Sequence, residues 1–477
     1  MFLGLDIGTS GVKAVVVDEH DQVVAQAGAP LAISRPQPMW AEQDPEEWWQ
    51  AVTTALDALA AEAPRAMAAV QAIGLSGQML GVTLLDAADQ PIRPALLWND
   101  GRASAECAKL ERRFPAFADT VGCRAMPGFS APKLLWLAHH EPQALAQARR
   151  VLLTKDYVRL RLSGETASDR ADSSATLLMD TRAGDWHEAI LATCGLDRSK
   201  LPRLVESVEI AGTLRRELAE RWHLPAATPI VGGAGDNMCA GVGVGAVTAA
   251  DAYIGLGTSG VYFLANDRFV PATSGGMHTH RHAVPNLYCQ NAVVLSAGAA
   301  LAWVAALLRT DIDVLMAEVE AARLTLAKTP VFTPYLSGER TPHDDPTLAA
   351  TFSSLTHNTS PAALAQSVLE GVSLALADCH DALLDSGAAI GTITLTGGGA
   401  RSDLWARLIA AALGCPLEVQ ADAQSGPALG AARLARQGIG GPLIVAHGSR
   451  RTVAPEASLR EQLLAKRAVF RKHLGLR

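Results

Sequence analysis

The pentapeptide Gly-Thr-Ser-Gly-Val occurs twice in this chain of 477 residues, at residues 8–12 and at residues 257–261. An apolar, strand-like run precedes each copy, and a second one follows it. A turn of Gly, Ser and Thr between two strands presents backbone N–H groups and hydroxyls in a small concavity, which suits a phosphate group. The repeat therefore predicts two related lobes, each with its own phosphate-binding turn.

The two copies differ in the residues beside them. The first copy has Asp6 shortly before its turn and Lys13 directly after it, whereas the second has Gly255 and Tyr262 at these places. An Asp at a strand end beside a phosphate turn can hold Mg²⁺ directly or through water, and Lys can meet phosphoryl oxygens. This asymmetry indicates a nucleotide held between the lobes. The alternative for each copy is an ordinary turn of small residues.

The bulk properties limit the class of partner. A net charge of −7 without a long basic run argues against nucleic acid or an anionic membrane as the main partner. The seven cysteines are scattered and form no C-x-x-C pair, as expected of reduced thiols. The N-terminus has no basic segment of the secretory type, so we expect a cytoplasmic protein.

Strand-like and helix-like runs alternate along the chain, with glycine turns at the strand ends. This order is typical of an α/β protein whose sites lie at those ends. The first 27 residues are expected to form a meander of three strands, and residues 361–385 a long helix. A cluster of glycines at 241–245 places the lobe boundary, which gives an N-terminal lobe of residues 1–245 and a C-terminal lobe of residues 246–477.

Asp236 lies on a glycine-flanked turn at the expected junction of the lobes. A carboxylate placed there could accept the proton of a substrate hydroxyl while that hydroxyl attacks phosphorus. Helix capping is the competing interpretation, because Asp is frequent at helix starts. The position alone does not decide between the two.

A run of three glycines at residues 397–399 follows a strand and opens a helix. Consecutive glycines let the backbone approach a flat or charged ligand closely. A tight connection that needs positive φ angles would explain the same residues. The run is therefore a candidate ligand site that needs support from other motifs.

Two further patterns carry less weight. Residues 241–246 fit the dinucleotide fingerprint G-x-G-x-x-A, but they lie inside an expected helix without a complete βαβ unit, so close helix packing is favoured over a dehydrogenase. His278, His280 and His282 alternate and could share one face of a strand. Without a Cys or carboxylate at useful spacing, a polar loop or a substrate-facing strand is favoured over a zinc site.

The turn at residues 98–102 combines an amide, an acid and a guanidinium group after an apolar run. Recognition of a polyol requires such a mixture of hydrogen-bond donors and acceptors. A capped turn with a solvated Arg102 is the competing interpretation.

Taken together and in this order, these segments resemble the FGGY carbohydrate kinases, and they are close to the xylulokinase branch of that family. The resemblance extends from residue 2 to about residue 435. Its most specific motifs are Trp-Asn-Asp-Gly-Arg at 98–102 and Ser-Gly-Glu-Arg-Thr-Pro at 337–342. The other matching segments are residues 4–13, 42–45, 131–136, 155–157, 235–237, 256–263, 397–402 and 426–432.

The resemblance implies two ribonuclease H-like lobes of the actin-like ATPase type, with ATP and sugar in the cleft between them. The N-terminal lobe would supply the sugar-binding and catalytic residues, and the C-terminal lobe would bind the nucleotide. The implied reaction is ATP-dependent phosphorylation of the terminal hydroxyl of a ketopentose, D-xylulose, to give D-xylulose 5-phosphate. A homodimer is a further expectation.

The resemblance also assigns roles to individual residues. Asp236 matches the catalytic base, and Asp6 the aspartate associated with Mg²⁺. The residues that would contact the sugar are Gln78, Met79, Leu80, Trp98, Asn99, Asp100, Asp236 and Asn237. The residues that would contact ATP are Thr9, Ser10, Lys13, Gly257, Thr258, Ser259, Gly398, Gly399, Ala400 and Ser402.

Leu80 departs from the pattern of the xylulokinase branch, which typically has His in the word Gly-Gln-Met-His-Gly. Leucine cannot donate a hydrogen bond to a sugar hydroxyl, so the preferred sugar can differ while the chemistry stays the same. One alternative is thus a sibling kinase for a pentitol, ribulose or glycerol. A more distant alternative is a nucleotide-switched binding protein with the same two-lobed fold.

Overall fold

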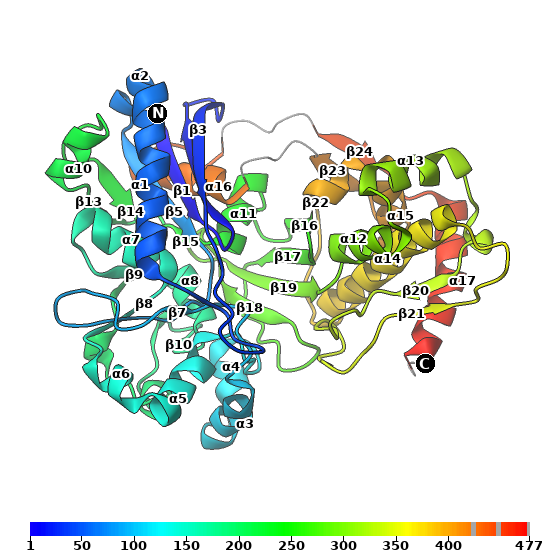
Figure 1. The fold of residues 1–477 in the computed structure, drawn as a ribbon, viewed down its shortest axis with the longest axis horizontal. Coiled ribbons are helices and arrows are strands. Elements are labelled where there is room, and N and C mark those ends of the chain that lie inside the picture. Colours follow the sequence, from blue (N-terminus) through cyan, green and yellow to red (C-terminus); the bar gives the residue numbers. More distant parts are fainter. Residues whose placement is uncertain (421–425, 445–449, 475–477) are drawn as a thin grey trace.

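A computed structural model of the protein describes residues 1–420, 426–444 and 450–474. Two lobes lie side by side, with most of the first half of the chain in one and most of the second half in the other (Figure 1). A seven-stranded mixed sheet forms the centre of each lobe. The α/β class expected from the alternation of strands and helices is confirmed.

The first sheet contains the meander expected for the N-terminus. Its strands, in spatial order, are β13 (Ile210–Thr213), β14 (Pro229–Val231), β5 (Ala72–Gly77), β1 (Phe2–Ile7), β2 (Gly11–Val17) and β3 (Val23–Pro30), with β15 (Ala234–Gly235) paired to β5. The strands β1, β2 and β3 are antiparallel neighbours, whereas β5 runs parallel to β1 and β14 parallel to β5. The first phosphate turn connects β1 to β2.

The second sheet repeats this arrangement. Its strands, in spatial order, are β18 (His278–Arg281), β19 (Tyr288–Val294), β17 (Gly260–Asn266), β16 (Ala252–Leu256), β22 (Ile393–Thr396), β23 (Leu417–Gln420) and β24 (Arg451–Val453). Again β16, β17 and β19 are antiparallel neighbours, and β22 runs parallel to β16. Because the second Gly-Thr-Ser turn connects β16 to β17, the two copies of the pentapeptide occupy equivalent places.

Helices cover both sheets. In the first half of the chain they are α1 (Pro45–Glu62), α2 (Pro64–Ala68), α3 (Ser104–Arg113), α4 (Phe117–Val121), α5 (Ser130–His140), α6 (Pro142–Gln147), α7 (Thr154–Ser163), α8 (Arg170–Ala175), α9 (Glu188–Thr193), α10 (Arg216–Arg221) and α11 (Asp236–Val244). In the second half they are α12 (Gly298–Leu308), α13 (Ile312–Ala322), α14 (Pro361–Asp385), α15 (Asp403–Leu413), α16 (Gly426–Gly438) and α17 (Ala457–His473). The remaining short strands are β4 (Glu42–Gln43), β6 (Thr83–Leu85), β7 (Ala95–Leu96), β8 (Arg150–Leu152), β9 (Ala167–Asp169), β10 (Met179–Asp180), β11 (Asp185–Trp186), β12 (Arg203–Val205), β20 (Val331–Thr333) and β21 (Thr351–Ser353).

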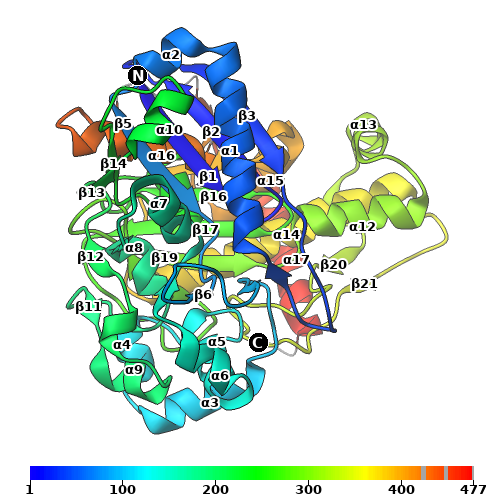
Figure 2. The same cartoon turned by 60° about the vertical axis from the view of Figure 1, so that its left-hand side comes forward.

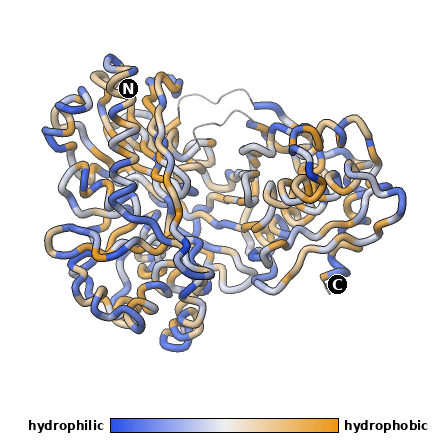
Figure 3. Tube along the Cα trace, in the orientation of Figure 1, coloured by the Kyte–Doolittle hydropathy of each residue, from blue (hydrophilic) through white to orange (hydrophobic). Residues whose placement is uncertain are grey.

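Local sequence explains where α1 begins and which side it buries. Asp44 caps the helix by accepting a hydrogen bond from the backbone N–H of Glu46, and Pro45 occupies the first helical position. Hydrophobic and hydrophilic residues alternate along the helix (Figure 3), and its apolar side, which includes Trp48 and Val52, is buried. An amphipathic helix of this kind gains its stability from packing on the sheet.

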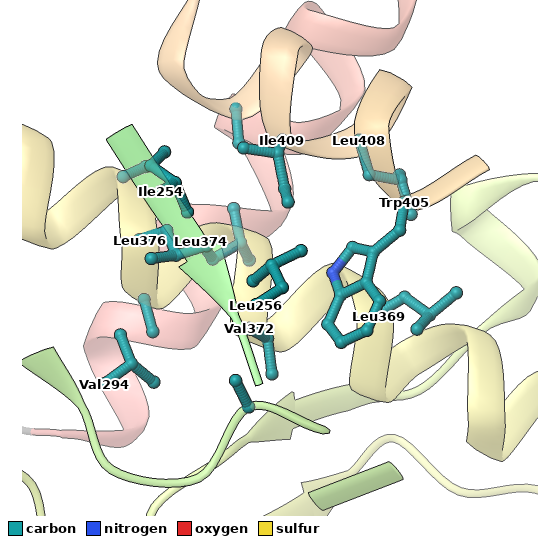
Figure 4. Packing of buried hydrophobic residues seen from close by; sticks show 14 of the residues in the cluster. Ile254, Leu256, Val294, Leu369, Val372, Leu374, Leu376, Trp405, Leu408 and Ile409 are labelled. Atoms are coloured by element: carbon teal, nitrogen blue, oxygen red, sulfur yellow. The ribbon is translucent and has the colours of Figure 1, made fainter. Parts of the chain in front are cut away.

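The core of the second lobe lies between α14, α15 and the sheet. Leu256 of β16 lies near Trp405 of α15, with Leu369 and Val372 of α14 close by (Figure 4). The helix α14 has the bounds expected from the sequence. It is long and apolar enough to cross a membrane, but 94% of its apolar window is buried inside the protein, as in a core helix.

The helix α16 belongs to the second half of the chain but packs on the first lobe, beside α11, β1 and β5 (Figures 1 and 2). Glycines allow this close approach. A Cβ on Gly74 would lie 1.9 Å from the carbonyl oxygen of Ala431, and one on Gly430 would lie 1.8 Å from that of Cys239. Gly243 of α11 also faces α16, so the interpretation of the 241–246 glycines as packing residues is confirmed.

Candidate active site

The first phosphate turn brings together the carboxylate of Asp6 and the ammonium group of Lys13, which the sequence singles out. Asp6 at the end of β1 pairs in register with Lys13 on β2 and with Ser76 on β5. The hydroxyl of Ser76 donates to Oδ1 of Asp6 at 2.8 Å. Oδ2 of Asp6 receives no hydrogen bond from the residues that the structure describes. This oxygen is therefore available for a ligand.

Burial sets the charge states of this pair. It raises the pKa of Asp6 to about 6, although the hydrogen bond from Ser76 and the charge of Lys13 lower it. Burial also lowers the pKa of Lys13, and the charge of Asp6 opposes that shift. A half-buried carboxylate with a raised pKa and an unused oxygen is poorly stabilised as an anion. A divalent cation would supply the missing stabilisation, so the donor set fits Mg²⁺.

The second turn is held from behind by the start of α12. The carbonyl oxygen of Thr258 accepts hydrogen bonds from Ala297 and Ala299, and that of Gly257 accepts one from Gly298. A Cβ at Gly298 would lie 2.5 Å from the carbonyl oxygen of Gly257, so this contact requires glycine. Gly257 and Thr258 are themselves exposed, and although the N–H of Gly257 donates to the carbonyl oxygen of Ser259 at 3.0 Å, the hydroxyl of Thr258 stays accessible.

A cavity of about 720 Å³ adjoins this second turn. Five of the predicted nucleotide contacts line it: Gly257, Thr258, Gly398, Gly399 and Ser402. Ala400, in contrast, is only 1% exposed and belongs to the core, and Ser259 and the exposed Ser10 are not among the lining residues. Apolar walls between two glycine turns suit a planar base with attached phosphates.

Several residues of this cavity were not predicted from the sequence. Ile312, Asp313 and Met316 of α13 line one side, and Trp405 of α15 lies beneath Gly399. In the sequence α13 is an ordinary amphipathic helix without a motif, so only its position in the fold reveals the role. Ser402 also caps α15, because its hydroxyl accepts a hydrogen bond from the N–H of Trp405 at 3.2 Å.

A hydrogen-bond chain connects the first phosphate turn to the expected sugar side. The hydroxyl of Thr9 donates to Oε1 of Gln78 at 2.9 Å, and the indole N–H of Trp98 donates to the Thr9 hydroxyl at 3.0 Å. Nε2 of Gln78 donates to the side chain of Gln43 at 2.8 Å. Both polar ends of Gln78 are thus engaged within the protein, and its side chain fixes the phosphate turn relative to the 98–102 turn.

The 98–102 turn divides into a buried part and an accessible part. Asp100 is 1% exposed, and its oxygens accept hydrogen bonds from Arg102 and from the backbone N–H of Ala41. Arg102 is buried against the ring of Trp40 at 3.6 Å rather than solvated. Trp98 is 44% exposed, and Oδ1 of Asn99 is buried without a hydrogen-bond partner among the residues that the structure describes. The exposed ring of Trp98 can thus contact a ligand while its N–H stays on Thr9, the oxygen of Asn99 remains to be satisfied, and Asp100 holds the turn.

Asp236 opens α11 directly after β15, where the first lobe meets the second. It lies half-buried, and its Oδ1 accepts a hydrogen bond from the adjacent N–H of Asn237 at 2.8 Å. The carbonyl oxygen of Asn237 is held by the hydroxyl of Tyr253 from the second lobe. Met79 packs against Gly235, since a Cβ on Gly235 would lie 2.5 Å from Cγ of Met79. The structure therefore places Met79 beside Asp236.

Burial and two neighbouring negative charges, those of Asp6 and Asp172, raise the pKa of Asp236 to about 8. Asp172 was not predicted as a site residue. It lies on α8 and forms a fully buried ion pair with Lys155, whose Nζ is 2.9 Å from Oδ2 of Asp172 and 2.7 Å from Oδ2 of Asp169. No spacing in the sequence predicts the cluster of Lys155, Asp169 and Asp172, because only the fold brings these residues together.

Leu80 adopts a left-handed backbone conformation, with φ of 68°. Its side chain is partly buried and packs against two hydrophobic clusters, one within the first lobe and one with residues from both lobes. Its carbonyl oxygen accepts hydrogen bonds from Ser130 at 3.0 Å and from Lys133 at 2.7 Å. The segment after Met79 is thus rigidly anchored although φ is unfavourable for leucine.

The three alternating histidines lie on or beside β18 at the centre of the molecule. His278 and His280 are buried against Phe129, which comes from the first lobe. His282 contacts the carbonyl oxygen of Ala246 at 3.0 Å. Burial lowers the pKa of all three, so they are neutral at physiological pH. Within the described ranges, no group of three or more His, Cys, Asp or Glu is arranged to hold a metal.

Comparison with known proteins shows the same two-part organisation. The N-terminal domain of the FGGY family of carbohydrate kinases matches residues 1–243, and the C-terminal domain matches residues 252–437. The xylulose kinase of Escherichia coli is 45% identical over 437 residues, which cover 91% of this chain and 90% of that protein.

Solved structures agree with this result. The crystal structure of a xyloylose kinase from Brucella ovis superposes with a TM-score of 0.95 at 42% identity and covers 99% of this chain and 98% of that one. The xylulose kinase of Rhodospirillum rubrum superposes with a TM-score of 0.91 at 28% identity, with the same coverage of both chains. With both family domains matched in order, this chain belongs to the FGGY family of carbohydrate kinases.

Proposed function

We propose that the protein is an ATP-dependent kinase that phosphorylates the terminal hydroxyl of D-xylulose to give D-xylulose 5-phosphate. The observation that carries this proposal is the 45% identity with the xylulose kinase of Escherichia coli over 91% of the chain. The arrangement of the site agrees with it, because Asp236 lies near Asp6 beside the first phosphate turn, and Oδ1 of Asn99 has no partner within the described part of the chain.

The finer architecture belongs to the same proposal. Each lobe would have the ribonuclease H-like core of actin-like ATPases, which is supported by the equivalent order of antiparallel and parallel strands in the two sheets. Residues 1–245 would supply the sugar-binding and catalytic groups, and residues 246–477 the nucleotide site. The helix α16 would be the exception, since it packs on the first lobe. The enzyme would act in the cytoplasm.

In this mechanism Asp236 takes the proton from the terminal hydroxyl of the sugar as that oxygen attacks the γ-phosphorus of ATP. Lys13 and the hydroxyl of Thr258 stabilise the charge on the phosphoryl oxygens, because the hydroxyl of Thr9 already donates to Gln78, and the Gly257–Thr258 turn holds the phosphates from the opposite lobe. Met79, Trp98 and Asn99 orient the sugar. Positioning and charge stabilisation supply most of the rate, because little covalent chemistry is required of the protein.

Asp6 would hold Mg²⁺, directly or through water, with Oδ2 as the available oxygen. The ion supplies neutralisation of the phosphate charge when it is bound. Ser76 keeps the Asp6 carboxylate oriented by its hydrogen bond to Oδ1. The residues of the phosphate turn then act on a nucleotide whose charge is partly compensated.

The raised pKa of Asp236 predicts how activity depends on pH. The base works only when ionised, and half of it is ionised near pH 8. We therefore expect kcat/KM for the sugar to fall by about tenfold per pH unit below that value. The measurement is kcat/KM between pH 6 and pH 9.5 at saturating ATP. A flat profile over this range would contradict the assignment of Asp236 as the base.

Leu80 supports a second candidate, a sibling kinase for another ketose or polyol, because leucine offers the sugar no hydrogen bond. A panel of D-xylulose, D-ribulose, L-ribulose, xylitol, ribitol and glycerol distinguishes the two functions. We expect kcat/KM to be highest for D-xylulose, by at least about tenfold over each competitor, because a site built for hydrogen bonds discriminates strongly. Faster turnover of a pentitol or of glycerol would replace the substrate but keep the kinase chemistry. ADP release that ignores every sugar would remove the kinase function altogether.

A further inference from the structure

One buried ammonium group lies between the two loops that would contact the sugar. Lys133 of α5 is 0% exposed. Its Nζ donates hydrogen bonds to the carbonyl oxygens of Leu80 at 2.7 Å, Leu97 at 2.8 Å and Leu96 at 3.2 Å. An ammonium group has three N–H donors, so all of them are used on main-chain oxygens.

These carbonyl groups belong to the residues next to the proposed sugar contacts. Leu80 follows Met79 and has the unfavourable φ of 68°. Leu97 precedes Trp98 and Asn99, the accessible part of the 98–102 turn. Lys133 thus joins two loops that come from different parts of the chain. A change in its position would move both sets of contacts at once.

Lys133 has no ion pair within the described part of the chain, although enclosing a charge is costly. The charged groups that affect it are Asp100 and Arg102, which are paired with each other. Burial lowers the pKa of Lys133 to about 7, the charge of Asp100 raises it, and that of Arg102 lowers it further. An apolar side chain of similar size would avoid this cost, so the lysine is unfavourable for packing alone.

We propose that Lys133 is a positioning residue for the sugar, which fixes the Met79–Leu80 segment and the Trp98–Asn99 turn at the spacing that the substrate requires. The inference rests on the proposed function, since the assignment of these loops to sugar binding is part of that proposal. It predicts a larger effect on sugar binding than on ATP binding, because the cavity that would hold the nucleotide is lined by residues of the other lobe.

The main test is Lys133→Met, which keeps the unbranched side chain up to the position of Cε and removes the three N–H donors. At pH 6.5 we expect the KM for the sugar to rise by about tenfold or more, because three buried carbonyl groups lose their partner, while the KM for ATP changes less than about twofold. The matched control is Lys200→Met. Its ammonium also donates to a backbone carbonyl of the first lobe, that of Leu145 at 2.8 Å, but far along the chain from either loop. We expect no change in either KM for this variant.

The pH dependence of the sugar KM gives a second test with the same variant. A neutral amine has two N–H groups, so the wild-type protein itself gives up one anchor when the pH rises through 7. The ratio of the sugar KM of Lys133→Met to that of the wild type should therefore be smaller at pH 8.5 than at pH 6.5. The titration of Asp236 cancels in this ratio, because both proteins contain that group. A ratio of one at both pH values would show that the ammonium has no such role.

Ser130→Ala keeps the inference testable if Lys133→Met does not fold. It removes only the 3.0 Å hydrogen bond to the carbonyl oxygen of Leu80, and we expect a smaller rise in the KM for the sugar, with ATP again unaffected. The inference is overturned if the sugar KM of every folded variant stays at the wild-type value, or if both KM values rise together. The sugar used is the best substrate of the wild-type protein. A wild type that phosphorylates no sugar would instead refute the proposed function.

Discussion

Asp236→Asn is expected to lower kcat for sugar phosphorylation by about 10²- to 10⁴-fold, the range typical of a lost general base. The amide keeps the shape of the side chain and can still accept the hydrogen bond from the N–H of Asn237. It cannot take a proton from the sugar hydroxyl. The measurement is ADP release coupled to formation of the phosphorylated sugar, at saturating ATP and sugar.

The control for this variant is Asp44→Asn, an equally conservative change in the same lobe. Asp44 caps α1, and asparagine caps helices as well as aspartate does, so turnover should stay at the wild-type level. If Asp236→Asn also turned over at the wild-type rate with the best substrate, the carboxylate would be a helix-start residue only. The KM for the sugar should change little, because the variant keeps the contacts of Met79 and Asn99.

Asp6→Asn has the second large expected effect, on the metal requirement. Loss of the charge should raise the Mg²⁺ concentration needed for half-maximal turnover by at least about 10- to 100-fold, as changes around metal sites typically do. The hydrogen bond from Ser76 can persist, because the amide oxygen still accepts it. Turnover is measured over a titration of Mg²⁺ at fixed ATP, with Ser76→Ala as a milder comparison.

The same variant also links the metal site to the base. The negative charge of Asp6 is one of the causes that raise the pKa of Asp236, so the midpoint of the pH profile should move to lower pH in Asp6→Asn. An unchanged metal requirement would remove the role of Asp6 in Mg²⁺ binding. An unchanged midpoint would show that the two carboxylates do not influence each other.

The sequence predicted the parts of the fold that local signals specify. The repeated pentapeptide predicted two equivalent turns between antiparallel strands, and the glycines at 241–246 predicted a helix packed at close range. The long helix at 361–385 was also correct, since its apolar pattern and its proline at the first position are local features. What no local pattern shows is that α16 leaves its own half of the chain and packs on the first sheet.

The site shows the same division between local and long-range information. Asp6, Lys13 and Ser402 stand in short motifs, and the structure places each of them beside a turn that the sequence had singled out. Asp172 and Lys155 come together only through folding, and the lining residues on α13 carry no motif. The prediction for Asp100 remains a proposal, but its oxygens are engaged by Arg102 and Ala41, which a sequence cannot reveal.

The packing of α16 has a consequence for how the protein can be assembled. The first sheet receives this helix from residues 426–438, so the ribosome must make most of the second lobe, up to α16, before the first can be completed. A fragment that ends at residue 245 would lack the partner of Gly4 and Gly74 and would expose an apolar surface. The two lobes therefore fold together. A single cut between them does not give two lobes that can be expressed or exchanged separately.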